Sequence, residues 1–530
     1  MKRKLSLVMT LMLAAGILAA AGCSENEQTS LDSAQTLTVM VFDRGNAPQN
    51  GETADNNRWT QWINDEFGKP NNIAVKFHPV PRSNEIEMLN VLMASGEAPD
   101  IVFTYERTIF NTFVAQNGLT DLTEYIDKYG SNLKALLGDD LKYHNIEGKQ
   151  YGLTAKRAFL GQISSFIRRD WLDKLNLPVP ETRDEWYNTI KAFMESDPDN
   201  VGKDKVIGYP LAATTFSNED WQQNTHHLVY SFVQKMSKKE FYTLPQLLYP
   251  GYKEGVRYLN KLYNEGIIDA DFALQNDYKK YEEHIANGRT GFFMIDVTTE
   301  LSDTAAVGTL YDSNPEAEYI AIDPFKNDEG VAAKRLNCPA AINIMVPKFS
   351  KCPDAAVKYL DWMSQEDIGL ELMYGVEGEH YELTEGIPVA INPDHIKESK
   401  WNNLDLSIIY NGYDFGGTEQ YYHAVELQYG RFGKLRADAS RISVESGFFD
   451  PFYTCVLEKK NKYESILNKK YQETMIKSIM ASEQDFDETY DNLVEEYMSI
   501  GGSEVQAEKE EAFERGDYFE NELESTYTLY

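Results

Sequence analysis

The sequence predicts an α/β protein of two lobes with a helical C-terminal part. Three observations support this prediction. Short apolar runs of β type alternate with stretches of helical period near the N-terminus. The chain of 530 residues is too long for one hydrophobic core. In the C-terminal part, helical spacing continues over residues 476–497.

The N-terminal region alternates strands and helices. Residues 37–42, 73–77 and 100–103 are short buried-looking β-type runs. Between them, apolar residues recur at helical spacing, as Trp59 and Ile63 do, and Gly96 ends the second helix. Strands of this kind, separated by helices, are typical of a parallel sheet covered by helices. We therefore expect the chain to open as an α/β lobe.

The later elements follow the same rules. Thr182 and Glu185 form a capping box at the start of a helix, because each side chain can bond a free amide of the first turn. Further β-type runs occur at 291–295 and 341–346, and a helix follows the second. Helical spacing continues over 476–497 until Gly501 and Gly502 interrupt it.

The N-terminus has the form of a secretion signal. Three cationic residues precede an apolar run over 5–21, and Cys23 follows Ala20, Ala21 and Gly22. This ending resembles the lipobox of bacterial lipoproteins, which implies cleavage after residue 22, lipidation of Cys23 and a polar tether over 23–35. An ordinary signal peptide, or a single membrane span with an incidental cysteine, is the alternative. No later segment is long and apolar enough to cross a bilayer.

Charge and cysteine content exclude several classes of protein. The formal net charge is −33, and the predicted signal peptide contains only cations, so the remainder is more acidic still. Nucleic acid is therefore not an expected partner. After Cys23 only Cys338, Cys352 and Cys455 remain, and their number and spacing predict neither a disulfide framework nor a zinc site.

Several segments together resemble one family. Residues 94–102 read ASGEAPDIV, Tyr151-Gly152-Leu153 precedes a block at 167–185 that begins IRRDWLDKL, and 375–381 read GVEGEHY. In this order, and with Gly288 to Phe293, they are similar to motifs of the family 1 extracellular solute-binding proteins, in particular the longer LplA-like lipoproteins. Together the motifs span nearly the whole mature chain.

This resemblance implies a type II periplasmic-binding-protein fold, in which two hinged lobes hold a ligand between them. By analogy, 36–155 and 335–385 form the N-terminal lobe, and 156–334 and 386–530 form the C-terminal lobe. The implied function is capture of a carbohydrate, most simply an oligosaccharide, and its delivery to an ABC permease. We expect a monomer on the outer face of the bacterial cell membrane, held by its lipid anchor, that is not an enzyme and needs no cofactor.

A carbohydrate site needs flat apolar plates and planar polar groups, because sugars present apolar C–H faces between hydroxyl rims. The best candidates follow predicted strands or lie in polar irregular segments, since open sheets bind ligands beyond the carboxyl ends of their strands. Tryptophans on helices, such as Trp171 and Trp186, are instead expected in the core. The candidates are Asp43, Arg44, Tyr105, Arg107, Arg157, Trp221, Asp296 and Tyr413.

One segment departs from a feature of the family. Longer relatives carry a calcium loop with oxygen ligands at alternate positions, but here Val201 occupies one ligand position. Asp197, Asp199 and Asp204 remain as weak metal candidates. The sequence favours a turn without metal.

Two alternatives stay open. A secreted glycosidase or lyase needs only two carboxylates, which an acidic sequence cannot exclude. No nucleophile elbow, zinc helix or P-loop is present in the sequence, however, and His226, His227 and His284 are expected on the surface. The other alternative is a peptide-binding or sensory protein of the same fold.

Overall fold

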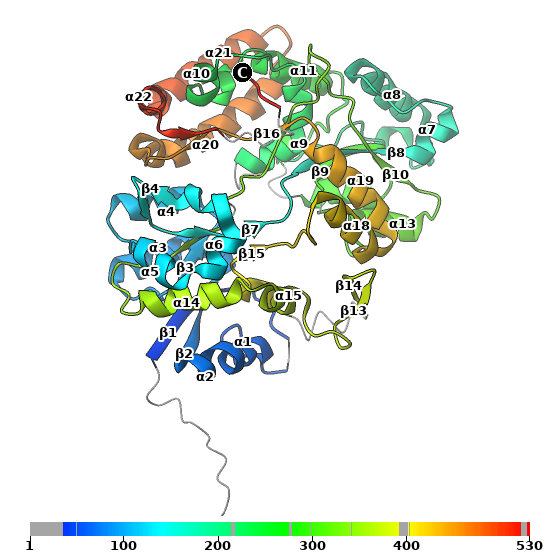
Figure 1. The fold of residues 1–530 in the computed structure, drawn as a ribbon. Coiled ribbons are helices and arrows are strands. Elements are labelled where there is room, and N and C mark those ends of the chain that lie inside the picture. The colour runs from blue at the N-terminus through cyan, green and yellow to red at the C-terminus, as the bar shows by residue number, and fades with distance from the viewer. Residues whose placement is uncertain are drawn as a thin grey trace, which may run out of the picture.

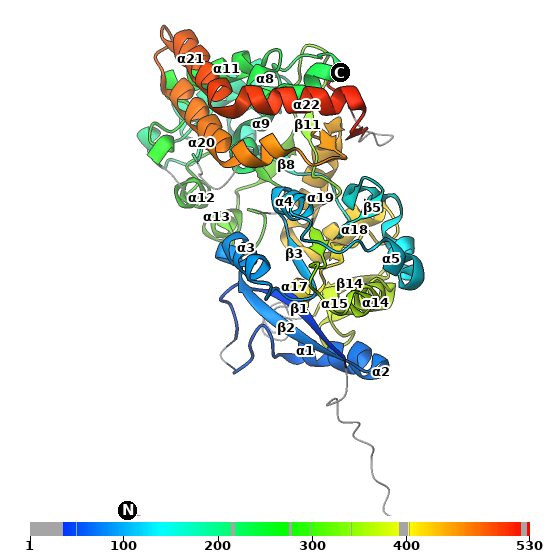
Figure 2. The same cartoon turned by 90° about the vertical axis from the view of Figure 1, so that its left-hand side faces the viewer.

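The computed structural model describes residues 35–48, 50–213, 218–274, 278–297, 299–340, 342–391, 401, 403–520 and 527–530. Two bodies lie one above the other (Figure 1), and the same division is visible after a quarter turn (Figure 2). The first body, drawn mostly in blue, cyan and yellow-green, begins with β1. The second contains most of the green elements and the orange and red helices.

The first core is built on a mixed sheet, with both parallel and antiparallel pairs. Strand β1 (Gln35–Asp43) pairs in parallel with β2 (Ile73–Pro81), and a parallel bridge from Val39 to Ile101 places β3 (Val102–Thr104) on its other side. Strand β12 (Asn343–Met345) then pairs antiparallel with both β3 and β6 (Leu153–Thr154). The predicted strands near 37–42, 73–77 and 101–103 are therefore confirmed.

Helices cover this sheet, and a buried set of apolar side chains from 37–155, 342–373 and 401–410 joins them to it. We call this assembly the first lobe. Asn57 and Thr60 form a capping box at the first helix. The helices are α1 (Arg58–Ile63), α2 (Lys69–Asn71), α3 (Glu85–Ser95), α4 (Arg107–Ala115), α5 (Thr123–Tyr129), α6 (Ser131–Leu137), α14 (Pro353–Met363), α15 (Glu366–Tyr374) and α17 (Asn403–Leu406).

Asp100 ties three segments of the first lobe together. Its carboxylate accepts hydrogen bonds from the amide and hydroxyl of Thr38 on β1, at 2.9 and 2.6 Å, and from the Ser350 hydroxyl at 2.7 Å. Burial opposes ionisation, but these hydrogen bonds prevail and lower the pKa of Asp100. Asp100 therefore fixes the start of β3 beside β1.

The second core contains an antiparallel sheet. Strand β8 (Ile163–Arg168) lies between β9 (Phe292–Asp296) and β10 (Tyr319–Ile322). The helices packed around this sheet are α7 (Arg169–Leu175), α8 (Arg183–Ser196), α9 (Asn218–Tyr230), α10 (Lys238–Thr243), α11 (Tyr252–Asn264), α12 (Lys279–Ala286), α13 (Ala306–Ser313), α18 (Thr418–Gln428) and α19 (Gly433–Val444). We call this assembly, together with the C-terminal helices, the second lobe.

The C-terminal part is helical, as predicted. Helices α20 (Glu458–Met480), α21 (Phe486–Tyr497) and α22 (Ser503–Arg515) pack against the second core. Gly501 has φ 142° between α21 and α22, and a Cβ there would come within 2.5 Å of the Tyr463 ring. Glycine is therefore needed at this turn. The final short strand β18 (Tyr518–Phe519) pairs with β17 (Phe452–Tyr453).

Main-chain hydrogen bonds join the segments that connect the two lobes. Strand β7 (Lys156–Arg157) pairs in parallel with β15 (Tyr410–Asn411), and the Ala158 amide donates to the Asn411 carbonyl at 3.0 Å. The Asn337 amide donates to the Leu160 carbonyl at 2.8 Å. Segments 156–160, 335–340 and 409–413 thus run together between the lobes, and we call them the connecting ribbon.

Candidate functional site

An aromatic pair lies at the carboxyl ends of two neighbouring strands of the first lobe. Phe42 in β1 and Tyr105, directly after β3, have ring centroids 6.1 Å apart and planes only 15° from parallel. The Arg82 guanidinium lies over both rings, 5.0 Å from Phe42 and 5.1 Å from Tyr105. Phe42 is buried, but Tyr105 is 39% exposed. These three residues, the Tyr105 platform, present an aromatic surface beside a cation that solvent reaches.

Glu85 holds the platform arginine in place. Its carboxylate pairs with Arg82 at 2.7 Å and accepts a hydrogen bond from the Thr104 hydroxyl at 3.0 Å. Burial raises the pKa of Glu85, although the Arg82 charge acts against this shift. The ion pair restricts the Arg82 side chain, so the guanidinium is already oriented before any ligand arrives.

Sequence reasoning found Tyr105 but missed Arg82 and Glu85. The second strand was predicted over residues 73–77. In the structure β2 continues to Pro81, since it pairs only with β1 among the described strands and an edge strand tolerates proline. Arg82 therefore follows the end of a strand, as Tyr105 does. The rule that selects polar residues after strand ends would have selected Arg82 if the second strand had been predicted to extend to residue 81.

Asp43 is the last residue of β1, and Arg44 follows the strand. The Arg44 guanidinium makes a bidentate ion pair with Asp405 of α17, with both distances 2.7 Å. This hydrogen bonding raises the pKa of Arg44. Asp43 is exposed and accepts a hydrogen bond from the Gly45 amide at 2.9 Å. Arg44 also lies 5.7 Å from the Phe42 ring, so it borders the Tyr105 platform.

Arg107 and Arg157 lie near the connecting ribbon. Arg107 is the first residue of α4 and lies between the rings of Phe110 and Phe452, at 4.4 and 4.8 Å. Arg157 is in β7, opposite Asn411. Both arginine charges act on Cys338, whose pKa is raised by burial. The structure therefore brings these two candidates to one region, where the lobes meet.

The candidates of the second lobe are Asp296 and Trp221. Asp296 is the last residue of β9 and pairs across the sheet with Ile163. Its charge acts on Arg436, which is 6% exposed and donates to the Leu301 carbonyl at 2.9 Å. Trp221 lies in α9, and its side chain is outside the described residues.

Tyr413 borders two grooves of the structure. It lines a groove of about 510 Å³ beside the connecting ribbon and a second groove of about 500 Å³ beneath the hairpin of β13 (Tyr381–Thr384) and β14 (Ile387–Ala390). Its hydroxyl bonds to Glu366, which also lines both grooves. None of the three platform residues lines either groove.

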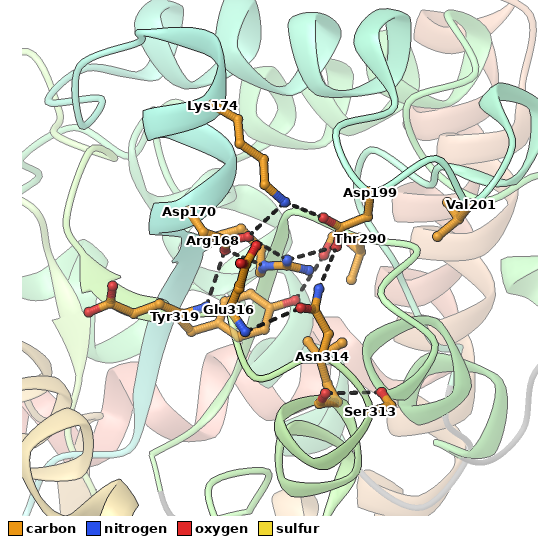
Figure 3. Close-up of polar contacts among 12 residues, drawn as sticks. Arg168, Asp170, Lys174, Asp199, Val201, Thr290, Ser313, Asn314, Glu316 and Tyr319 are labelled. Atoms are coloured by element: carbon orange, nitrogen blue, oxygen red, sulfur yellow. Dashed lines mark hydrogen bonds and ion pairs between the residues drawn. The ribbon is translucent and has the colours of Figure 1, made fainter.

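The loop after α8 holds its carboxylates with groups from the protein itself (Figure 3). Asp197 ends α8 and accepts hydrogen bonds from the amides of Val201 and Gly202, at 2.9 and 2.8 Å. Asp199 pairs with Arg168 at 2.8 Å and with Lys174 at 2.6 Å. The Asp199 carboxylate therefore already has two cations.

This arrangement does not fit calcium. Asp204 is exposed, and the apolar side chain of Val201 lies apart from the ion pairs (Figure 3). Burial opposes ionisation of Asp199, yet the Lys174 hydrogen bond and the Arg168 charge lower its pKa. Within the described residues, no group of three or more potential ligands from His, Cys, Asp and Glu is placed to hold a metal. A calcium ion would have to displace two cationic side chains.

The expectation that the histidines lie on the surface is wrong. His226, His227 and His284 are all under 5% exposed. His226 accepts a hydrogen bond from the Arg335 amide at 3.0 Å and stacks on Tyr230, while the His227 ring bonds to the Ser165 hydroxyl at 2.9 Å. Burial lowers the pKa of His227 to about 3, so this ring is neutral and has a structural role.

The predicted signal peptide, Cys23 and nearly all of the tether lie outside the described residues. In the part of the chain that is described, no helix combines the length and apolar character needed to span a bilayer.

Comparison with known proteins identifies the family. Residues 50–369 match the family model described as bacterial extracellular solute-binding protein. Lipoprotein LipO of Bacillus subtilis is 26% identical over 394 residues, which cover 73% of this chain and 76% of LipO. The polygalacturonan/rhamnogalacturonan-binding protein YtcQ of the same organism is 25% identical over 97% of this chain and 99% of YtcQ.

A solved structure confirms the fold. An HMO-binding, ABC-transporter-associated solute-binding protein from Bifidobacterium longum infantis superposes with a TM-score of 0.67 at 19% identity, covering 92% of this chain and all of that one. The predicted type II binding-protein fold is therefore confirmed. Because the family model matches more than half of the sequence, the chain belongs to the bacterial extracellular solute-binding proteins.

Proposed function

We propose that this protein captures an oligosaccharide outside the cell and delivers it to an ABC permease. The Tyr105 platform carries the proposal. The Tyr105 ring is exposed and has the Arg82 guanidinium beside it. An aromatic ring can contact the apolar face of a sugar, and a guanidinium can donate hydrogen bonds to the hydroxyl groups at its rim. The binding of polygalacturonan and rhamnogalacturonan by YtcQ, which matches this chain nearly end to end, supports the same ligand class.

The ligand would lie between the lobes, with Tyr105, Arg82 and Arg44 on the first lobe and the Asp296 end of β9 on the second. Closure about the connecting ribbon would then bring the two surfaces onto the sugar. We place the lobe limits at 36–155 with 335–385 and at 156–334 with 386–530, except that we move 401–410 from the second lobe to the first, because these residues pack in the core of the first lobe.

Binding without turnover is part of the proposal. The family relatives are substrate-binding proteins. Glu300 is a buried carboxyl that could be considered as a catalytic acid, because burial raises its pKa to about 7. It accepts a hydrogen bond, however, from the Ala306 amide at the start of α13. Its role is thus to cap a helix.

Calorimetric titration of the mature protein with neutral and acidic oligosaccharides, and with peptides, tests the proposal. We expect saturable binding of an oligosaccharide, and chromatography of the recovered ligand should show it intact. Release of shorter products would instead identify an enzyme, and binding of peptides alone would reassign the ligand class.

The anchor is tested separately. Lipidation of Cys23 would place the protein at the outer face of the membrane. In cells, the Cys23→Ala variant should move from the membrane fraction to the soluble fraction, and mass spectrometry should no longer find a diacylglyceryl group. Retention of the variant in the membrane would contradict the lipoprotein assignment.

A further inference from the structure

We infer that Arg107 forms an anion subsite at the junction of the lobes, where it binds a carboxylate of an acidic oligosaccharide. This inference rests on the proposed function and names the charge of the ligand. Arg107 begins α4 directly beyond the end of β3, and Phe452 of the second lobe covers one side of its guanidinium. The Arg107 guanidinium therefore lies at the junction of the two lobes, in contact with a residue from each.

Arg107 has no carboxylate partner in the described part of the chain. Its Nη1 atom is buried without a hydrogen-bond partner, and the guanidinium lies over the rings of Phe110 and Phe452. Cation–π contacts offset part of the cost of burying a charge but satisfy none of its N–H donors. Three other arginines each hold a carboxylate: Arg44 with Asp405, Arg82 with Glu85, and Arg335 with Asp450.

The electrostatic surroundings of Arg107 favour the binding of an anion beside it. Burial lowers its pKa to about 9, which indicates a cation that its neighbours do not compensate. Arg157 adds a second positive charge beside Cys338. The N-cap residue of α4 is Glu106, whose side chain does not cap the helix, and no acidic residue follows in the first turn, so the helix end can still favour a ligand anion.

The size of the space fits a carboxylate. A cavity of about 90 Å³ is lined by Cys338, by Phe452 and by the ion pair of Arg335 with Asp450. Arg107 does not line this cavity, but its guanidinium lies 4.8 Å from the Phe452 ring. Typical pockets for whole ligands measure about 300 to 1,000 Å³. The cavity therefore has room for a substituent of a sugar but not for a ring. Arg335 and Asp450 neutralise each other, so Arg107 is a cation beside this cavity that has no carboxylate partner in the described part of the chain.

The test uses oligouronates and their neutral forms. The mature protein, Arg107→Met and the control Arg183→Met are titrated with trisaccharides of galacturonate, glucuronate and mannuronate, and with the methyl ester of each. Arg183 is a matched control, because its guanidinium also covers a phenylalanine ring, 3.7 Å from Phe232, but lies on α8 in the second lobe.

We expect the native protein to bind one uronate at least 10-fold more tightly than its methyl ester. Arg107→Met should abolish this preference, whereas Arg183→Met should retain it. The unliganded Arg107→Met variant should also melt at a higher temperature than the native protein, because an uncompensated buried charge has been removed. A purely structural role for Arg107 would lower the melting temperature instead.

The outcomes separate the two proposals. Equal affinity of native protein and Arg107→Met for the uronate, or binding of the neutral sugars alone, would overturn the anion subsite and leave the carbohydrate proposal standing. Failure of every oligosaccharide to bind, with both proteins folded by circular dichroism, would overturn both.

Discussion

The guanidinium of Arg82 lies 5.1 Å from the centre of the Tyr105 ring. A cation and an aromatic ring are thereby held together at the end of the first-lobe sheet. Since Glu85 already fixes Arg82, the pair needs little reorganisation when a ligand arrives.

Loss of the Tyr105 ring should weaken sugar binding. We expect Tyr105→Ala to reduce affinity about 10- to 100-fold, because stacking of an aromatic ring on an apolar face and the associated burial contribute about 1 to 3 kcal/mol. Tyr105→Phe keeps the ring and should lose less than 10-fold. Calorimetry on the best ligand measures both. Equal affinity of the alanine variant and the native protein would exclude the platform from the site.

The loop after α8 should be indifferent to calcium. We expect the melting temperature to be the same in EDTA and in millimolar calcium, because Arg168 and Lys174 already neutralise Asp199. Asp199→Asn should destabilise the protein by about 2 to 4 kcal/mol, since it leaves the fully buried Arg168 with only Asp170 as partner. The exposed Asp204→Asn change is the control and should have little effect. A calcium-dependent rise in melting temperature would contradict this reading.

Glu300 should make stability depend on pH between about 4.5 and 7. Its carboxyl is 2% exposed, and its pKa is raised in the folded state, so the folded protein binds this proton more tightly than the unfolded chain. The stabilisation is complete below the unfolded pKa and is lost as pH rises through about 7. Glu300→Gln should therefore be more stable than native at pH 8, by about 1 to 3 kcal/mol. Denaturant titrations at pH 5 and pH 8 measure the difference, which should shrink at the lower pH.

Asp100 has the opposite dependence on pH. Its pKa is lowered in the folded state, so its contribution is present above the unfolded pKa and is lost as pH falls through the folded value. Asp100→Ala should cost about 2 to 3 kcal/mol at pH 7, because it leaves the Thr38 amide and the Ser350 hydroxyl without this acceptor. Urea unfolding measures the loss, and an unchanged midpoint would mean that water replaces the carboxylate without cost.

Much of the fold could be predicted from local sequence. The capping box of Thr182 and Glu185 is present in the structure, with the Glu185 amide bonded to the Thr182 hydroxyl at 3.2 Å. Trp171 and Trp186 are fully buried, as expected. Such features depend on neighbours in the chain or on a clear apolar pattern, so the sequence contains the necessary information.

Other features depend on contacts between distant segments. Strand β8 was missed because it ends in the charged Arg168, which is buried only because Asp170 and Asp199 surround it. The histidines were assigned to the surface because polar residues usually lie there, whereas Ser165 and the Arg335 amide supply their partners from elsewhere in the fold. Whether the eight predicted ligand residues bind sugar stays a prediction.

The connecting ribbon has a mechanical consequence. Its segments are bonded to each other through the main chain, as in the contact of Lys156 with Ile409, so they cannot bend independently. We expect the two lobes to rotate relative to each other about one hinge axis that all three segments share. The same faces would then meet at every closure, whatever side chains occupy the surface.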